Sequence, residues 1–294
     1  MRGARPQRAL EHAILSDPRL RDGESIIVAC SGGPDSVALA AAMRFASPKR
    51  KWRLCIAHVN HGARPSADQD EAVVLHVAAT LQLPIMTAHL NDLARDEQTM
   101  RKARYDALKR SAKDFGATVV TTAHTAEDQT ETVLLALFRG TGTSGLTGIA
   151  ARRKLADRID LCRPLLRCTH EQLRRYCESM CLPYAFDPTN DDLTYRRNAV
   201  RGALTTLRLS FPGLDRAVAR AAYIVAEELG GAPRAALRRR VREALEETGE
   251  LLDVDFEHVE SAVRALERGR SGVFHAKRGV TVRLGRGQLS VKKR

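Results

Sequence analysis

The stretch Ser31–Ser36, SGGPDS, decides the fold that we expect for this chain of 294 residues. The apolar run SIIVAC (25–30) leads into it, and the helical run VALAAAMRFA (37–46) leads out. Two glycines let the backbone turn sharply and approach a ligand closely. The N–H groups of the turn and of the helix start then point at one spot that suits an anion. The loop lacks the GxxxxGK[ST] spacing and the lysine of a Walker A loop, so its function is predicted to differ from that of a Walker A loop.

Strand and helix patterns alternate around this loop at a spacing of about 30 residues. Buried strands are predicted at 52–61, 84–90, 117–124 and 158–166, and helices at 66–81, 96–115 and from residue 169. Such alternation indicates an α/β fold with an open, parallel, Rossmann-like sheet. Polar residues at the carboxyl ends of these strands then share one ligand-binding edge.

The C-terminal part has a different pattern. Residues 214–229 read as a linker helix, two amphipathic helices follow at 233–248 and 254–266, and short strands separated by glycines end the chain. We therefore expect a catalytic domain over 1–209, and a helical linker with a small basic α+β domain over 210–294.

Charge and cysteine usage narrow the class of protein. The formal net charge is +13 and the pI is about 9.9, which indicates a polyanionic partner, RNA or DNA first. The alternative is an arginine bias that merely solvates the surface. Basic residues gather in the last 31 positions and in an arginine cluster over 234–242. Six scattered cysteines, no apolar run of about 18 residues and no apolar leader predict reduced thiols, no membrane span and a cytoplasmic location.

A second motif, AHTAEDQTET, follows the strand that ends at His124. Thr125 and Asp128 have the spacing of a helix N-cap with an acid three residues later. Glu131 lies on the same helix face as Asp128, so paired carboxylates are expected at the sheet edge. Acids beside a polyphosphate usually hold Mg²⁺ or handle protons and amines.

Other stretches are weaker signals. His58 and His61 form an HxxH pair, read as polar strand-end residues rather than a metal site, since no third ligand has convincing spacing. The glycine-rich stretch 140–148 is either a loop that moves over a substrate or a plain surface loop. The polar, turn-rich stretch 184–201 carries arginines that can reach phosphates.

These motifs together resemble one family, the tRNA(Ile)-lysidine synthetases of the N-type ATP pyrophosphatase (PP-loop) superfamily. The resembling segments are SGGPDS, AHVNHG, MRKARY, AHTAEDQTET, FRGTGTSGLTGI, and DPTN followed by YRRNAVR. Their order and spacing cover almost the whole chain. The resemblance implies a sheet of the adenine nucleotide alpha hydrolase type.

The resemblance also implies an activity. ATP would adenylate the wobble cytidine of tRNA(Ile) with a CAU anticodon, and pyrophosphate would leave into the loop. Free L-lysine would then attack C2 and release AMP, giving lysidine and switching decoding from Met to Ile. ATP and Mg²⁺ are the implied cofactors, and a homodimer is one open oligomeric state.

The resemblance assigns roles to residues of this chain. Four are catalytic candidates: Asp35, Asp128, Glu131 and Arg197. Ten are nucleotide-binding candidates: Ser31, Gly32, Gly33, Pro34, Asp35, Ser36, His58, Arg104, His124 and Arg201. Two are candidate Mg²⁺ ligands: Asp35 and Asp128.

The chain departs from the family pattern at three positions. Thr125 replaces a second histidine, Glu127 precedes Asp128, and Thr189 stands in a serine place. Three rivals remain: a PP-loop tRNA thiolase, an ATP-dependent amidating enzyme of small metabolites, and a non-catalytic RNA-binding protein on the same fold. A thiolase would need cysteine pairs that are missing here, and a small substrate would not need the basic tail.

Overall fold

The computed structural model of the chain describes residues 6–60, 67–90, 97–185, 196–247, 256–267, 272–277, 280–285 and 288–293. These residues fall into two compact units. Unit 1 comprises residues 1–141 and 148–220, and unit 2 comprises residues 142–147 and 221–294. The expected division into domains 1–209 and 210–294 remains a prediction about how the chain is organised.

Unit 1 is built on a six-stranded sheet with the order β3-β2-β1-β4-β6-β5. The strands are β1 (Ser25–Ala29), β2 (Arg53–Asn60), β3 (Ile85–His89), β4 (Val119–Thr121), β5 (Arg152–Ala156) and β6 (Ile159–Cys162). Every neighbouring pair is parallel except β5 with β6, which is antiparallel. The predicted open parallel α/β sheet is therefore confirmed, with one antiparallel edge strand added.

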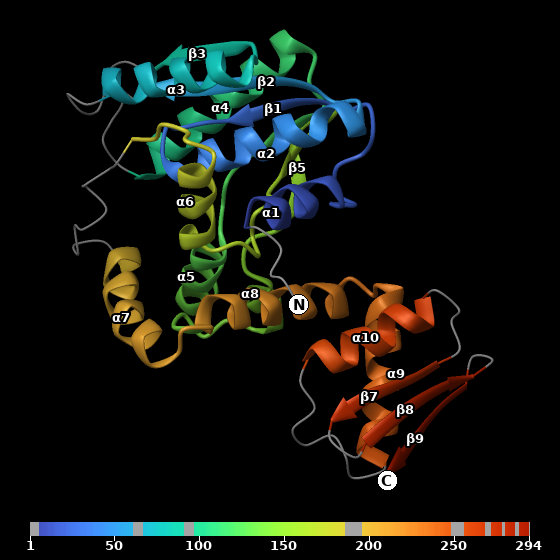
Figure 1. Ribbon diagram of the computed structural model, residues 1–294. Helices are drawn as coiled ribbons and strands as arrows, with labels where there is room; N and C mark the ends of the chain where they lie inside the picture. The colour runs from blue at the N-terminus through green and yellow to red at the C-terminus, as the bar shows by residue number, and fades with distance from the viewer. Residues whose placement is uncertain are drawn as a thin grey trace. The chain divides into compact units, whose positions relative to one another are not determined.

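Helices cover both faces of this sheet (Figure 1). The helices of unit 1 are α1 (Pro6–Leu15), α2 (Pro34–Arg50), α3 (Ala67–Leu81), α4 (Glu97–Phe115), α5 (Ala126–Leu137), α6 (His170–Ser179) and α7 (Arg196–Ser210), of which α7 packs against α5. Side chains alternate along β1, so Ile26 and Val28 join the core beneath α1, α2, α3 and α6. Ile27 instead joins Leu108 of α4 on the opposite face. The wholly apolar strand run thus reflects burial on both sides.

Two elements of unit 1 differ from the sequence expectation. The sequence pattern predicts no strand at β5 (RRKLA), because an edge strand with exposed side chains shows no apolar alternation. It forms a hairpin with β6, which is shorter than the predicted strand 158–166. The second is α7, which occupies the end of the supposedly turn-rich stretch 184–201. Val200 and Leu204 provide its buried face, a pattern hidden among arginines and polar residues.

Unit 2 contains helices and a small antiparallel sheet. Its elements are the C-terminal part of α8 (Leu214–Leu229), the 3₁₀ turn η1 (Thr143–Thr147), α9 (Pro233–Glu247), α10 (Phe256–Glu267), β7 (Gly272–Lys277), β8 (Val280–Gly285) and β9 (Gln288–Lys293). The order β7-β8-β9 confirms the predicted α+β character of the tail. Among the helices described, none is both long and apolar enough to cross a membrane.

The arginine cluster of α9 is mostly used inside unit 2, which corrects its reading as a free polyanion surface. Arg238 is 2% exposed and pairs with Glu227 of α8 and Glu260 of α10. Arg234 pairs with Glu260 and Glu267. A guanidinium carries several donors in a planar fork, so one arginine can join acids from two helices. The cluster therefore holds three helices together.

Candidate active site

The Ser31–Ser36 loop lies between β1 and α2, as the sequence predicted. The Ser31 N–H donates to Ser36 Oγ at 3.1 Å, and the Ser36 hydroxyl donates to the Gly33 carbonyl oxygen at 2.9 Å. Ser36 therefore braces the loop from within, whereas Ser31 is exposed. Gly32 has φ +96°, and a Cβ there would lie 3.2 Å from the Asp70 carbonyl oxygen of α3. Glycine is required here by conformation and by space.

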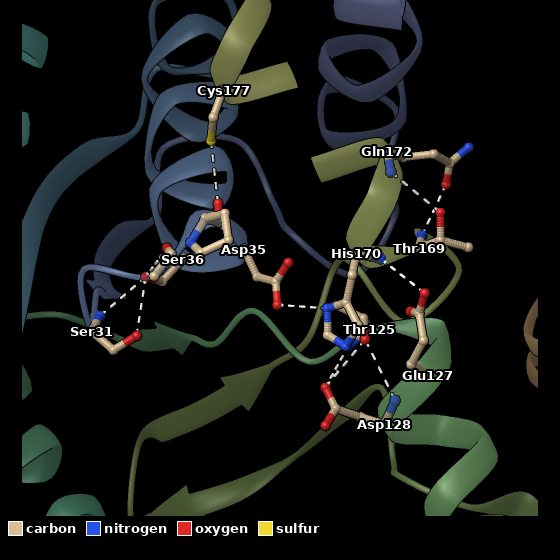
Figure 2. Close-up of polar contacts among 12 residues, drawn as sticks. Ser31, Asp35, Ser36, Thr125, Glu127, Asp128, Thr169, His170, Gln172 and Cys177 are labelled. Atoms are coloured by element: carbon tan, nitrogen blue, oxygen red, sulfur yellow. Dashed lines mark hydrogen bonds and ion pairs between the residues drawn. The ribbon is translucent and has the colours of Figure 1, made fainter. Parts of the chain in front are cut away.

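Three helices begin around this loop: α2 at Pro34, α5 at Ala126 and α6 at His170 (Figure 2). The first turn of each helix has N–H groups without intrahelical acceptors, and each start carries a partial positive charge. Gly33 precedes α2 without any side-chain cap, and Pro34 occupies the first turn, where it costs no hydrogen bond. The start of α2 is therefore left open for an anion.

His170 joins the three helix starts, although no sequence motif marks it as a site residue. Its Nδ1 lies 2.8 Å from Asp35 Oδ2 at the start of α2. Its backbone N–H donates to Glu127 Oε1 of α5 at 3.0 Å. Burial lowers the pKa of His170, but the hydrogen bond and charge of Asp35, with Glu127 and Asp128, outweigh it and raise the pKa to about 9. The imidazole is therefore protonated at neutral pH.

The acids beside His170 have different environments. Asp128 Oδ2 accepts the Thr125 N–H at 2.9 Å, and the Thr125 hydroxyl caps the Asp128 N–H, which confirms the predicted capping pair. Glu127 is 9% exposed, and burial raises the pKa of its carboxyl group above the usual range, against the charge of His170. Departures from the family pattern at positions 125 and 127 thus form a cap and a buried acid.

His124 lies where β4 gives way to α5, with its Nδ1 3.0 Å from Thr122 Oγ1. Burial is the main cause that lowers the pKa of His124, to about 3, with Arg163 and Arg104 adding to it and Asp128 opposing it. The ring is therefore neutral at pH 7. It can donate or accept a hydrogen bond beside a nucleotide, but it carries no charge.

Glu131 is not a free partner of Asp128, although both lie on α5. Glu131 is 2% exposed, and Arg201 of α7 donates to it from Nε at 2.6 Å and from Nη2 at 3.3 Å. Arg201 was expected to contact phosphate or adenylate. The geometry ties its guanidinium to a buried carboxylate in a bidentate pair.

The remaining predicted residues are placed as follows. His58 of β2 is 3% exposed, its Nδ1 lies 2.9 Å from the Cys30 carbonyl oxygen, and its buried Nε2 has no partner among the described residues. Arg104 packs its guanidinium over the Tyr105 ring at 5.4 Å. Arg197 lies on α7, but its side chain is outside the described residues. His61 and residues 186–195 also lie outside them.

An observation bears on a bound cation. Asp35 Oδ1 is buried, and no described residue hydrogen-bonds to it. Such an oxygen fits Mg²⁺, which typically takes one or two carboxylates together with substrate phosphates. No group of three His, Cys, Asp or Glu side chains in the described part of the chain can hold a metal ion by itself. The donor set therefore fits a cation that arrives with a polyphosphate.

Glu127 and His170 are the site residues that sequence reasoning missed. One signal was present, because Thr169 and Gln172 have the capping-box spacing that places His170 first in a helix. That signal marks where α6 begins. It does not reveal that α6 begins beside Asp35, 135 positions earlier in the chain.

The chain is similar to known proteins over most of its length. Residues 5–207 match the PP-loop domain family. A tRNA(Ile)-lysidine synthase of Salinispora tropica is 39% identical over 226 residues, covering 75% of this chain and 67% of that protein. One from a Synechococcus strain is 35% identical and covers 76% of this chain and 69% of that protein. The solved U34-tRNA thiolase NcsA from Methanococcus maripaludis, with its [4Fe-4S] cluster, has a TM-score of 0.62 at 15% identity, covering 73% of this chain and 76% of that one. That likeness concerns the fold alone.

Proposed function

Since the chain belongs to the PP-loop family and, within it, to the tRNA(Ile)-lysidine synthases, we propose that it forms lysidine on tRNA(Ile) in an ATP-dependent ligation. The ligated amine is that of free L-lysine, and the acceptor is C2 of the wobble cytidine in the CAU anticodon. The products are lysidine, AMP and pyrophosphate, and decoding changes from Met to Ile.

One observation carries this proposal. The starts of α2, α5 and α6 meet at a glycine loop, and the start of α2 has no side-chain cap. Attack on the α-phosphate of ATP by the cytidine O2 builds negative charge on the departing pyrophosphate. Fixed N–H dipoles and helix starts stabilise that charge without reorganising. The protonated His170 adds a positive charge beside Asp35.

The acids of the site supply the second half of the reaction. Lysine enters as an ammonium ion and must lose a proton before its nitrogen attacks C2. Asp128 is half-buried at the start of α5, where its carboxylate can bind the ammonium and help remove the proton. Glu131, paired with Arg201, supports this position from the next turn of the helix.

Mg²⁺ belongs to the proposal through Asp35, whose buried Oδ1 is free to bind it, and Asp128 is the second candidate ligand. When bound, the ion neutralises phosphate charge in the transition state. Asp35 Oδ2 is held by His170 at 2.8 Å, so the other carboxylate oxygen is the one left for a cation.

The proposal extends to partners and location. The basic domain predicted over 210–294 binds the body of the tRNA, and the reacting cytidine is unstacked into the site as in other readers of RNA loops. The enzyme acts in the cytoplasm, where its substrates are. The proposed oligomeric state is a homodimer, and the roles proposed for the site residues do not depend on it.

The test is incorporation of labelled lysine into a tRNA(Ile) transcript with a CAU anticodon, with ATP, read by nucleoside mass spectrometry. Asp128→Asn should abolish it, because the amide oxygen can still cap Thr125 while the charge is lost. Asp157→Asn, at an exposed turn position, is the matched control and should retain activity.

Several outcomes would overturn the proposal. Wild-type protein that transfers sulfur from a donor to the tRNA, but never lysine, would identify a thiolase. Full activity in Asp128→Asn would remove the assigned role of that residue. Binding of tRNA with no ATP-dependent product would indicate a non-catalytic RNA-binding protein.

A further inference from the structure

A basic pocket lies between α4 and β5, apart from the Ser31–Ser36 loop. Its volume is about 310 Å³, and its charged lining comprises Arg101, Lys102, Asp106, Lys109 and Arg153. Lys109 Nζ is 2.9 Å from Asp106 Oδ1, so the charges of these two side chains offset each other. The other three side chains are exposed cations. Within the described part of the chain, none of the three pairs with a carboxylate.

Three guanidinium groups surround one ring at the inner wall of this pocket. The Arg101, Arg104 and Arg153 guanidinium carbons lie 5.3, 5.4 and 5.5 Å from the Tyr105 ring centroid. Cation–π attraction offsets part of their mutual repulsion. Burial would raise the pKa of Tyr105, but the nearby arginines outweigh it and lower the pKa. The pocket therefore has a strongly positive potential.

The same arginines connect the pocket to the proposed reaction centre. Arg104 and Arg101 act electrostatically on His124, together with the buried Arg163. His124 in turn interacts with Asp128 at the start of α5. The positive surface thus begins beside the site and continues outward along α4 and β5. ATP phosphates have a separate place at the start of α2, so this surface is open to a different anion.

We propose that this pocket binds a backbone phosphate of the tRNA next to the reacting cytidine, an inference that rests on the proposed function. A nucleotide brought into the site carries phosphodiesters on both sides, and these must lie against protein at the site's edge. Arginine forks and lysine ammonium groups are the usual partners of RNA phosphates. Arg153 and Lys102 reach the pocket from opposite walls, β5 and α4, so they clamp the phosphate between them.

The experiment measures tRNA(Ile) affinity of the full chain as a function of salt. The variants are Arg153→Gln, Lys102→Gln and the double substitution. Two controls remove the same charge outside the pocket. Lys154→Gln changes the next residue of β5, which faces the other way and pairs with Asp160 at 2.9 Å. Arg110→Gln changes an exposed residue of α4 that does not line the pocket.

Each pocket variant should weaken tRNA binding about fivefold and lower the slope of log affinity against log salt by roughly 0.7–0.9. In steady-state assays, KM for tRNA should rise while kcat is kept, and ATP affinity should stay at the wild-type value. Arg153→Lys keeps the charge and should restore the salt slope. The controls should bind tRNA like the wild type.

Equal affinities and slopes in pocket variants and controls would overturn the assignment. Weakened ATP binding with unchanged tRNA binding would also overturn it, since the pocket would then serve a free polyphosphate. Failure of the proposed function is a separate result, because it appears as a wild-type protein that forms no lysidine. The affinity of tRNA for the pocket variants is measured whether or not lysine is transferred.

Discussion

Replacing Arg201 with methionine should destabilise unit 1 more than it changes any ligand contact, because Arg201 neutralises the buried Glu131. The Glu131 side chain is 3% exposed, and it accepts two hydrogen bonds from the Arg201 guanidinium. Without the arginine, the Glu131 carboxyl group loses these two hydrogen bonds while it stays buried. Methionine keeps the length of the aliphatic stem, so the lost packing is small.

The magnitude follows from burial. Removing one partner of a fully buried ion pair costs about 3–5 kcal/mol. The Arg201 side chain is 34% exposed, so water screens part of the interaction. We expect a loss of about 2–3 kcal/mol for Arg201→Met. Glu131→Gln should cost only about 1 kcal/mol, since the arginine can turn to solvent, and the double variant should give a coupling energy of about 1–2 kcal/mol.

The assay is equilibrium unfolding in urea, followed by the fluorescence of Trp52. That residue is the single tryptophan of the chain, it is 6% exposed, and it lies in unit 1. Its emission therefore reports the unit that contains the ion pair. Arg201→Lys retains a cation and should recover about half of the lost stability.

Two results would refute this reasoning. One is an Arg201→Met protein that unfolds at the wild-type urea concentration. The other is a double-variant cycle in which the two single effects add to within about 0.3–0.5 kcal/mol, as for independent sites. A stable Arg201→Lys protein that binds ATP weakly would instead favour the nucleotide contact expected from the family resemblance.

Three further predictions concern the loop, an acid of α3 and the histidine of α6. Gly32→Ala should weaken ATP binding about tenfold in calorimetric titration, because the position has φ +96° and lacks room for a Cβ. The Asn60 hydrogen bond is the main cause that holds the pKa of Glu71 below its usual range, so the stabilisation exists above pH ~4.3 and is lost as the pH falls further. Glu71→Gln should therefore cost about 0.5–1 kcal/mol at pH 7 and almost nothing in acid, by urea unfolding. His170→Ala should raise KM for ATP about tenfold in steady-state kinetics, since Asp35 loses the partner 2.8 Å from its Oδ2.

Matched controls make these results decisive. Gly23→Ala has a similar φ of +76° but nothing within 4 Å, so ATP binding should be unchanged. Glu178→Gln and His76→Ala alter exposed helical residues of the same types. A Glu71→Gln loss that is equal at pH 7 and in acid would contradict the pKa argument. An equal effect of His170→Ala and His76→Ala on ATP use would remove His170 from the site.

The elements that sequence predicted well depend on neighbours in the chain. The loop 31–36 needs glycines between an apolar strand and a helix, and this requirement is visible in six residues. The Thr125–Asp128 cap spans one helical turn, so its spacing alone identified it. β5 could not be found in this way, because an edge strand is specified by its partner β6 rather than by its own apolar pattern.

The roles of charged residues were harder to predict, because the identity of a charged residue does not reveal which residue it pairs with. Arg238 looks like a surface arginine in the sequence, yet it is buried among acids from two other helices. Glu131 looks like a second catalytic acid, yet it is paired with an arginine 70 positions later. In each case the deciding contact is long-range.

By itself, therefore, the sequence determined the glycine loop at 31–36, the parallel α/β order and the family. The loop and the strand order follow from glycine conformation, periodic burial and spacing within a turn or a strand, which are local properties, and the family follows from the resemblance of six motifs. Tertiary structure alone decided that His170 joins Asp35 to Glu127 and that Glu131 faces Arg201. The physical reason is that parallel strands bring distant helix starts to one edge of the sheet. There, charged side chains pair with groups that are near in space, whatever their separation in the sequence.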